Sequence, residues 1–192
     1  MTKRNYDAIP VEPAFVHKLF NTTKFAWLWA VLRIYLGYEW LMAGWHKATG
    51  TGWVDGGSAL KGFWTNVIKV PTTGKAAITY DWYRSFLEFL LGHNTYTWFG
   101  KLIAYGEVLI GICLIVGLLT GFAAFGGALM NFNFMLAGSA STNPVLFFIA
   151  VLLIMAWKAA GYLGADRFVL PAIGTPWRAA TAEGPDRDRK EA

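Results

Sequence analysis

The sequence predicts an all-α integral membrane four-helix bundle, with two amphipathic interfacial helices in its first long connection. Hydrophobic residues make up 55% of the chain and charged residues only 15%, whereas a soluble domain carries about 25% charged residues. The run 98–140 holds one charged residue after Leu102, namely Glu107. At about 1.5 Å per residue, this run can cross a bilayer core of about 30 Å twice. Trp and Tyr, which favour membrane interfaces, are abundant.

The chain is interpreted as one polytopic domain, 25–177, between a polar basic leader, 1–24, and a charged tail, 178–192, expected to be disordered. The net charge is +5, and the basic residues concentrate near both termini. We attribute this charge to membrane topology and anionic lipid rather than to nucleic acid. Because Cys113 is the single cysteine, no disulfide can form within the chain.

The first predicted span is 25–45, a run of about 20 residues, the length that crosses a bilayer. It carries two charged residues, Arg33 and Glu39. A spacing of i, i+4, i+7 and i+11 places four residues on one helix face: Arg33, Gly37, Trp40 and Gly44. Glu39 lies on a different face, so the two charges do not belong to one stripe.

The long connection 46–97 is predicted to contain two amphipathic helices, at 57–69 and 78–92, each with an apolar stripe at helical spacing. Both are too short to span a bilayer. One interpretation places them at the membrane interface, with an apolar face in lipid or against the bundle. The alternative is a soluble helical hairpin that folds over the end of the bundle.

The second and third spans are predicted at 99–119 and 121–140, with a break at Gly121. The segment 141–143 is a predicted turn, and a fourth span follows at 144–163, since proline suits the first position of a helix. Four spans put both termini on one side. Lys and Arg residues accumulate in the leader and after residue 157, while the two short connections have none. The positive-inside rule therefore predicts cytoplasmic termini in the cell inner (plasma) membrane.

Counting about 1.5 Å per residue from the outer edge places Glu39 and Glu107 at similar depths, about 9 and 10 Å below it, with Arg33 deeper. Charges inside a membrane are costly, so these side chains are expected to face the bundle interior. We expect Arg33 to pair with at least one carboxylate, beside a pocket. Alternatively, one carboxylate is protonated, or the cluster only fixes the register of the helices.

The sequence order of several short motifs resembles the DoxX/DoxD family over residues 25–177. These motifs are Arg33-x3-Gly37 with Ala43-Gly44-x2-Lys47, Gly106-Glu107-x3-Gly111 with Gly117-Leu118-x-Thr120, and Gly161-x2-Gly164-x-Asp166-Arg167. The resemblance implies a four-helix membrane protein. Some DoxD-like members are the membrane subunit of a thiosulfate:quinone oxidoreductase, and the long connection 46–97 is similar to that branch. Other relatives are accessory proteins, and a DoxA-like domain is not recognisable here.

The expected function is that of a membrane subunit of a quinone-linked redox system, oxidising thiosulfate or a related sulfur compound. Glu107 or Glu39 would carry the proton, and Arg33 would be the hydrogen-bond donor. The substrate-binding residues would be Trp40 and Tyr105 as walls, with His46 and Lys47 at the outer mouth attracting an anion. Quinone is the expected electron acceptor, and no haem, Fe–S or metal motif is evident.

The alternative is a non-catalytic accessory or scaffold subunit of a larger respiratory or redox complex. Both interpretations expect the lipid bilayer and other membrane subunits as partners, and neither involves nucleic acid. A transporter or channel is less favoured, because the sequence shows neither a broken helix nor an internal repeat.

Overall fold

The computed structural model describes residues 12–175 and Trp177, and every regular element in this part of the chain is a helix. The predicted all-α class is therefore confirmed. The predicted tail, 178–192, lies outside the described residues, as does the first part of the predicted leader, 1–11.

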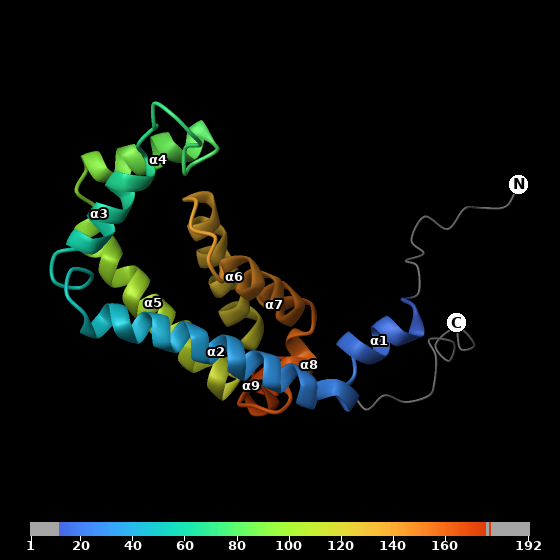
Figure 1. Ribbon diagram of the computed structural model, residues 1–192. Coiled ribbons are helices and arrows are strands. Elements are labelled where there is room, and N and C mark those ends of the chain that lie inside the picture. Colours follow the sequence, from blue (N-terminus) through green and yellow to red (C-terminus); the bar gives the residue numbers. More distant parts are fainter. Residues whose placement is uncertain (1–11, 176, 178–192) are drawn as a thin grey trace, which may run out of the picture.

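Four longer helices form the body of the molecule. Helix α2 (Ala26–Thr49) packs along α5 (Tyr96–Val116), and α6 (Thr120–Leu136) packs along α7 (Asn143–Met155). Figure 1 shows the two pairs inclined to each other, with α5 and α6 meeting near the end that also holds α9. The long helices thus occupy the positions in the chain at which the sequence predicted spans.

Short helices cover the two ends of this body (Figure 1). At one end lie α3 (Ser58–Val67) and α4 (Asp81–Gly92), within the segments predicted to be amphipathic helices. Their apolar faces pack against α5 and form a hydrophobic core at this end of the molecule. The buried residues of this core include Leu60, Trp64, Tyr83, Leu87, Leu90 and Ile103. At the other end lie α8 (Trp157–Gly161) and α9 (Asp166–Ala172).

The helix boundaries differ from the expected ones at two places. Helix α5 ends at Val116, because Gly117 adopts a left-handed conformation with φ 73°, and the turn therefore precedes Gly121. The predicted fourth span, 144–163, is divided at Ala156, whose φ of −96° and ψ of 16° leave the α-helical region. Its two parts are α7 and α8, so this span is not one continuous helix.

The turn between α5 and α6 is held by a residue from the far end of the chain. Asp166, at the start of α9, is fully buried, and its carboxylate accepts hydrogen bonds from the N–H groups of Leu119 (2.6 Å) and Thr120 (2.8 Å). A carboxylate in this position satisfies amides that have no partner at the start of a helix. The sequence analysis placed Asp166 beyond the last span and missed this role.

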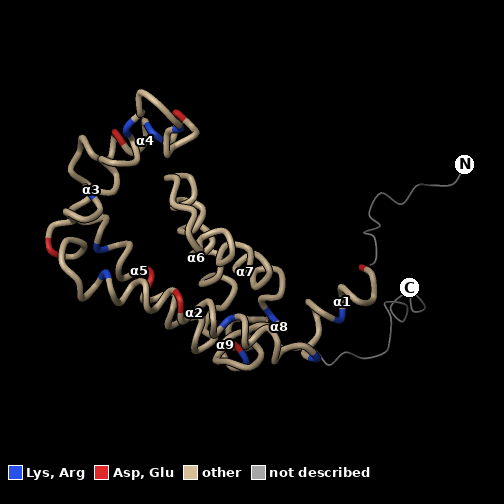
Figure 2. The backbone as a smooth tube through the Cα atoms, in the orientation of Figure 1, with Lys and Arg blue, Asp and Glu red and all other residues tan. Residues whose placement is uncertain are grey.

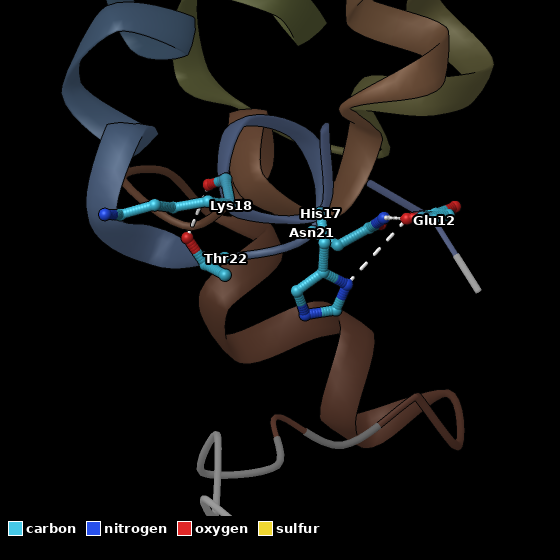
Figure 3. A network of polar contacts seen from close by, with 5 residues as sticks. All are labelled: Glu12, His17, Lys18, Asn21 and Thr22. Atoms are coloured by element: carbon cyan, nitrogen blue, oxygen red, sulfur yellow. Dashed lines mark hydrogen bonds and ion pairs between the residues drawn. The ribbon is translucent and has the colours of Figure 1, made fainter. Parts of the chain in front are cut away.

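The described part of the leader forms a short helix, α1 (Ala14–Phe20), followed by a 3₁₀ turn at Thr23–Phe25. Figure 3 shows the polar contacts around it: the side-chain amide of Asn21 donates to the Glu12 carboxylate at 2.8 Å. The Nδ1 atom of His17 lies 3.8 Å from the same carboxylate. All three side chains are exposed, and exposed polar pairs contribute little to stability.

Of the helices that the structure describes, one is long and apolar enough to cross a membrane by itself, Tyr96–Val116; Asn143–Met155 is apolar but shorter. Helix α2 has 24 residues, which makes it about 36 Å long, but it carries Arg33, Glu39 and Lys47. Figure 2 shows that Lys, Arg, Asp and Glu are absent from α6 and α7.

Candidate functional site

A cavity of about 320 Å³ lies between α2, α5, α6 and the loop that leads into α7. We call it the polar pocket. The helices α2, α5 and α6 contribute Glu39, Trp40, Lys47, Glu107 and Asn131 to its polar lining. The segment that leads into α7 adds Ser139, Ser141, Thr142 and Asn143, and the walls include the aromatic rings of Trp53, Phe63 and Phe134. All four long helices therefore contribute polar groups to one cavity inside a largely apolar body.

A close crossing of α2 and α5 positions the charged pair of the pocket. A Cβ atom on Gly44 would lie 2.5 Å from the backbone nitrogen of Val108 and 2.8 Å from the Cβ atom of Glu107, so only glycine permits this approach. Lys47 lies one turn after Gly44, and its Nζ atom is 2.7 Å from Oε2 of Glu107. The Glu107 side chain is only 1% exposed, and that of Lys47 is 20% exposed. The two residues thus form an ion pair between helices.

Aromatic rings complete the surroundings of the Lys47 ammonium group. Its Nζ atom lies 5.2 Å from the centre of the Trp53 ring and 6.0 Å from that of Phe134. A cation over an aromatic face is attracted by the quadrupole of the ring. Lys47 is therefore held in place by the carboxylate and by both rings, and it is not a free cation at the mouth of the pocket.

Four buried polar atoms around the pocket have no hydrogen-bond partner within the described chain. They are Oε1 of Glu107, Nε1 of Trp40 and both side-chain polar atoms of Asn131. Buried polar groups in proteins are nearly always satisfied, and an unsatisfied one costs about 1–3 kcal/mol. A donor, an acceptor and an amide with both capacities therefore lie buried in residues that line one cavity, with their hydrogen-bonding capacity unused. This arrangement suits a small polar ligand that both accepts and donates hydrogen bonds.

The sequence-predicted site residues divide into two groups. Four of them, Glu39, Trp40, Lys47 and Glu107, line the polar pocket together. His46 and Tyr105 are exposed and do not line it, and the Tyr105 side chain is 55% exposed. Glu39 is half-buried at the edge of the pocket, and it forms no ion pair among the residues that the structure describes.

The structure differs from the expectation for Arg33, which pairs with no carboxylate among the described residues. Its guanidinium group donates instead to backbone carbonyls of Leu114, Ile115 (3.0 Å) and Leu163 (3.0 Å). The physical reason is the early end of α5 at Val116, which leaves the last carbonyls of that helix without helical partners. Arg33 lies about 21 Å from Lys47 along α2, so it holds helix ends together away from the polar pocket.

Among the pocket residues that were not predicted from the sequence, Asn131 is the one whose buried polar atoms have no partner within the described chain. It is fully buried on α6, one turn after Gly127. A Cβ atom on Gly127 would lie 2.8 Å from Nε1 of Trp40, so this glycine makes room for the indole. The sequence feature that could have identified Asn131 is the spacing of Ala123, Gly127 and Asn131. This spacing places a polar amide on the same helix face as two small residues.

Within the described part of the chain, no three His, Cys, Asp or Glu residues lie close enough together to hold a metal ion. No family model matches the sequence, and neither a curated protein nor a solved structure matches it.

Proposed function

We propose that this chain is an integral membrane protein in which α2, α5, α6 and the pair α7–α8 cross the bilayer. The support is the apolar surface of these helices. Their large exposed side chains are overwhelmingly aliphatic or aromatic, and they include Trp27, Val31, Ile34, Leu102, Leu109, Ile112, Phe122, Phe125, Phe132, Val145 and Phe148. Water-exposed surfaces rarely carry contiguous apolar patches of this extent, whereas lipid solvates them at no cost.

In this arrangement the termini are cytoplasmic in the cell inner membrane, and α3 and α4 lie at the outer face. A reporter that is active only in the cytoplasm should give signal when fused after Ala192. The same reporter should be silent when fused at Gly74, in the loop between α3 and α4, because the first span has carried that loop outward. Signal at Gly74 and silence at Ala192 would invert the topology.

The proposed activity is that of the membrane subunit of a quinone-linked redox system. The observation that carries it is the set of unpartnered polar atoms of Trp40, Glu107 and Asn131 around one cavity. A quinone ring is small, flat and apolar except at its two carbonyls, and these carbonyls accept hydrogen bonds. The pocket offers aromatic walls and two donors, and it has a carboxylate where a proton is needed.

The residues have separate roles in this proposal. The Trp40 indole N–H and the Asn131 amide orient the ring by donating to its carbonyl oxygens. When bound, the quinone supplies the two-electron acceptor. Reduction of the quinone to the quinol takes up two protons, and Glu107 would relay each of them from water to a ring oxygen through Oε1, the oxygen that Lys47 leaves free. Lys47 fixes the carboxylate and balances its charge inside the membrane.

We infer the identity of the electron donor and the family of the chain from the sequence resemblance. We place the chain in the DoxX/DoxD family, with thiosulfate or a related sulfur compound as reductant. Since Lys47 is engaged by Glu107, the anion would meet the exposed His46 on the outer face, and electrons would reach the pocket with the help of a partner subunit. Thiosulfate-dependent quinone reduction by membranes that contain the chain tests this assignment, and its absence would remove thiosulfate as the donor.

The Trp40 indole N–H can be tested by measuring how strongly the protein binds a quinone analogue. We expect Trp40→Phe to weaken binding of a tail-less quinone analogue about fivefold to tenfold, the effect of losing one hydrogen bond of about 1 kcal/mol. Trp29→Phe is the matched control. Trp29 is equally buried and also loses an indole N–H, which donates to the Leu19 carbonyl at 2.8 Å, but it does not line the pocket.

Equilibrium titration of the purified protein in detergent measures both dissociation constants. The proposal expects Trp29→Phe to bind like the wild type. Equal affinity of the wild type and Trp40→Phe would remove the indole from the site, and absence of binding to the wild type would end the quinone proposal.

A second candidate, a non-catalytic scaffold subunit, is favoured by the outward face of α4. This face exposes the rings of Tyr80, Trp82, Phe86 and Phe89, each between 43% and 62% exposed. Such a row of aromatic side chains suits contact with a neighbouring membrane protein as well as with lipid. Copurification of a large complex that is lost in a Trp82→Ala, Phe89→Ala double variant, together with no quinone binding, would favour this alternative.

A further inference from the structure

A second cavity, of about 360 Å³, lies beside the polar pocket and between α3, α4, α5 and α6. We call it the apolar cavity. Its lining is almost wholly aliphatic, aromatic or glycine, and two of its residues, Leu102 and Leu129, are more than half exposed. The cavity therefore opens on the apolar outer surface of the bundle, at a level where the proposed topology places lipid.

The two cavities are neighbours. Phe63 of α3 and Phe134 of α6 line both of them, so one pair of aromatic rings forms a shared wall. On α5, Gly106 lines the apolar cavity and the next residue, Glu107, lines the polar pocket. The two cavities therefore adjoin each other along α5 and these two rings.

Two glycines create the space of the apolar cavity, and helix packing does not require either of them. A Cβ atom on Gly106 would meet nothing within 4 Å, and one on Gly126 would only touch the Ile110 side chain at 3.4 Å. Gly44 and Gly111 are different, because a Cβ atom there would collide with the backbone of the facing helix. Glycine inside a helix is unfavourable relative to alanine, so the open space at Gly106 and Gly126 calls for another explanation.

We propose that the apolar cavity holds the polyprenyl chain of the quinone whose ring enters the polar pocket. This inference rests on the proposed function and adds the substrate class: quinones that carry an isoprenoid chain and reach the site from the bilayer. Lipid is as apolar as the cavity, so burial alone gives the chain little preference between them. The cavity contributes its shape: it provides the path by which a chain attached to the bound ring leaves the protein.

The test fills the cavity from either wall with Gly106→Leu or Gly126→Leu. Binding of two probes is measured in lipid nanodiscs: a quinone with several isoprene units and an analogue with the same ring and only a methyl group. We expect the long-chain quinone to bind about tenfold or more weakly to the leucine variants, a typical effect of overpacking. The tail-less analogue should bind them within about twofold of the wild type, because the added side chain does not reach the polar lining.

Gly92→Leu is the matched control, since Gly92 has open space around it but lines neither cavity. If leucine prevents folding, as judged by the thermal midpoint, Gly106→Ala adds one methyl group in open space and should weaken the long-chain probe about twofold. Unchanged long-chain binding in these variants, or an equal loss for both probes, would overturn the inference. A bound phospholipid that Gly106→Leu expels without affecting long-chain quinone binding would assign the cavity to lipid instead.

The outcomes separate the two proposals. If the wild type binds neither probe, the proposed function fails. If the wild type binds both, and filling the apolar cavity affects neither, the quinone site stands and only the path of the chain is wrong.

Discussion

Replacing Glu107 by glutamine should lower thiosulfate-dependent quinone reduction at least about 100-fold per folded molecule, the scale of a lost proton-transfer group. Glutamine has nearly the same shape and keeps an oxygen for the Lys47 ammonium, which lies 2.7 Å from Oε2 in the wild type. It cannot take up or deliver the proton at Oε1. Binding of the tail-less analogue should therefore change by no more than about threefold, because the donors of Trp40 and Asn131 remain.

The matched control is Glu39→Gln, which also removes a carboxylate from the lining of the polar pocket. Glu39 is half-buried, and it has no ion-pair partner within the described residues, so we expect it to tolerate the change. Steady-state turnover, normalised to folded protein by size-exclusion chromatography, compares the two variants. Wild-type turnover in Glu107→Gln, or a larger loss in Glu39→Gln, would move the proton site away from Glu107.

The second large effect is expected at the crossing of α2 and α5. A Cβ atom on Gly44 would lie 2.5 Å from the Val108 nitrogen and 2.9 Å from the Ala104 carbonyl oxygen, which are rigid backbone atoms of α5. Gly44→Val should therefore force the helices apart, and we expect loss of most folded protein, since overpacking costs about 1–3 kcal/mol and backbone clashes cost more. Any protein that folds should lose quinone reduction, because Lys47 would no longer hold the Glu107 carboxylate in the polar pocket.

Gly62→Val controls for the change of residue type, because Gly62 lies in α3 with nothing within 4 Å of its Cβ position. Folded yield and the midpoint of thermal unfolding in detergent are the readouts. A Gly44→Val protein as stable as Gly62→Val would show that α2 and α5 do not depend on this contact.

Much of the helical pattern could be predicted from the sequence because it follows from hydrophobic periodicity and from local turn signals. The two amphipathic helices and the four long apolar segments were predicted from such periodicity and turn signals. The end of α5 was misplaced because both Gly117 and Gly121 can end a helix, and the tertiary contacts of Asp166 with the turn decide between them. Such a contact joins residues 46 and 47 positions apart, beyond the reach of a local pattern.

The candidate site could be predicted only in part, for a similar reason. Glu107 was identified because a charge in an apolar run is conspicuous. Arg33 was expected to pair with Glu39 or Glu107, but depth along a helix says little about which faces of two helices meet. The structure pairs Glu107 with Lys47, because Gly44 lets α2 approach α5 one turn before that lysine. Asn131 was missed because an uncharged amide among small residues resembles ordinary packing between membrane helices.

The central claim is that the polar pocket binds a quinone ring, and photolabelling tests it most directly. A quinone analogue with a photoreactive azido group on its ring is irradiated with the wild-type protein, and the labelled peptides are identified by mass spectrometry. The account predicts label on α2 near Trp40 and on α6 near Asn131, both competed away by unlabelled quinone. Label confined to lipid-facing positions such as Phe148, or insensitive to competition, would contradict it.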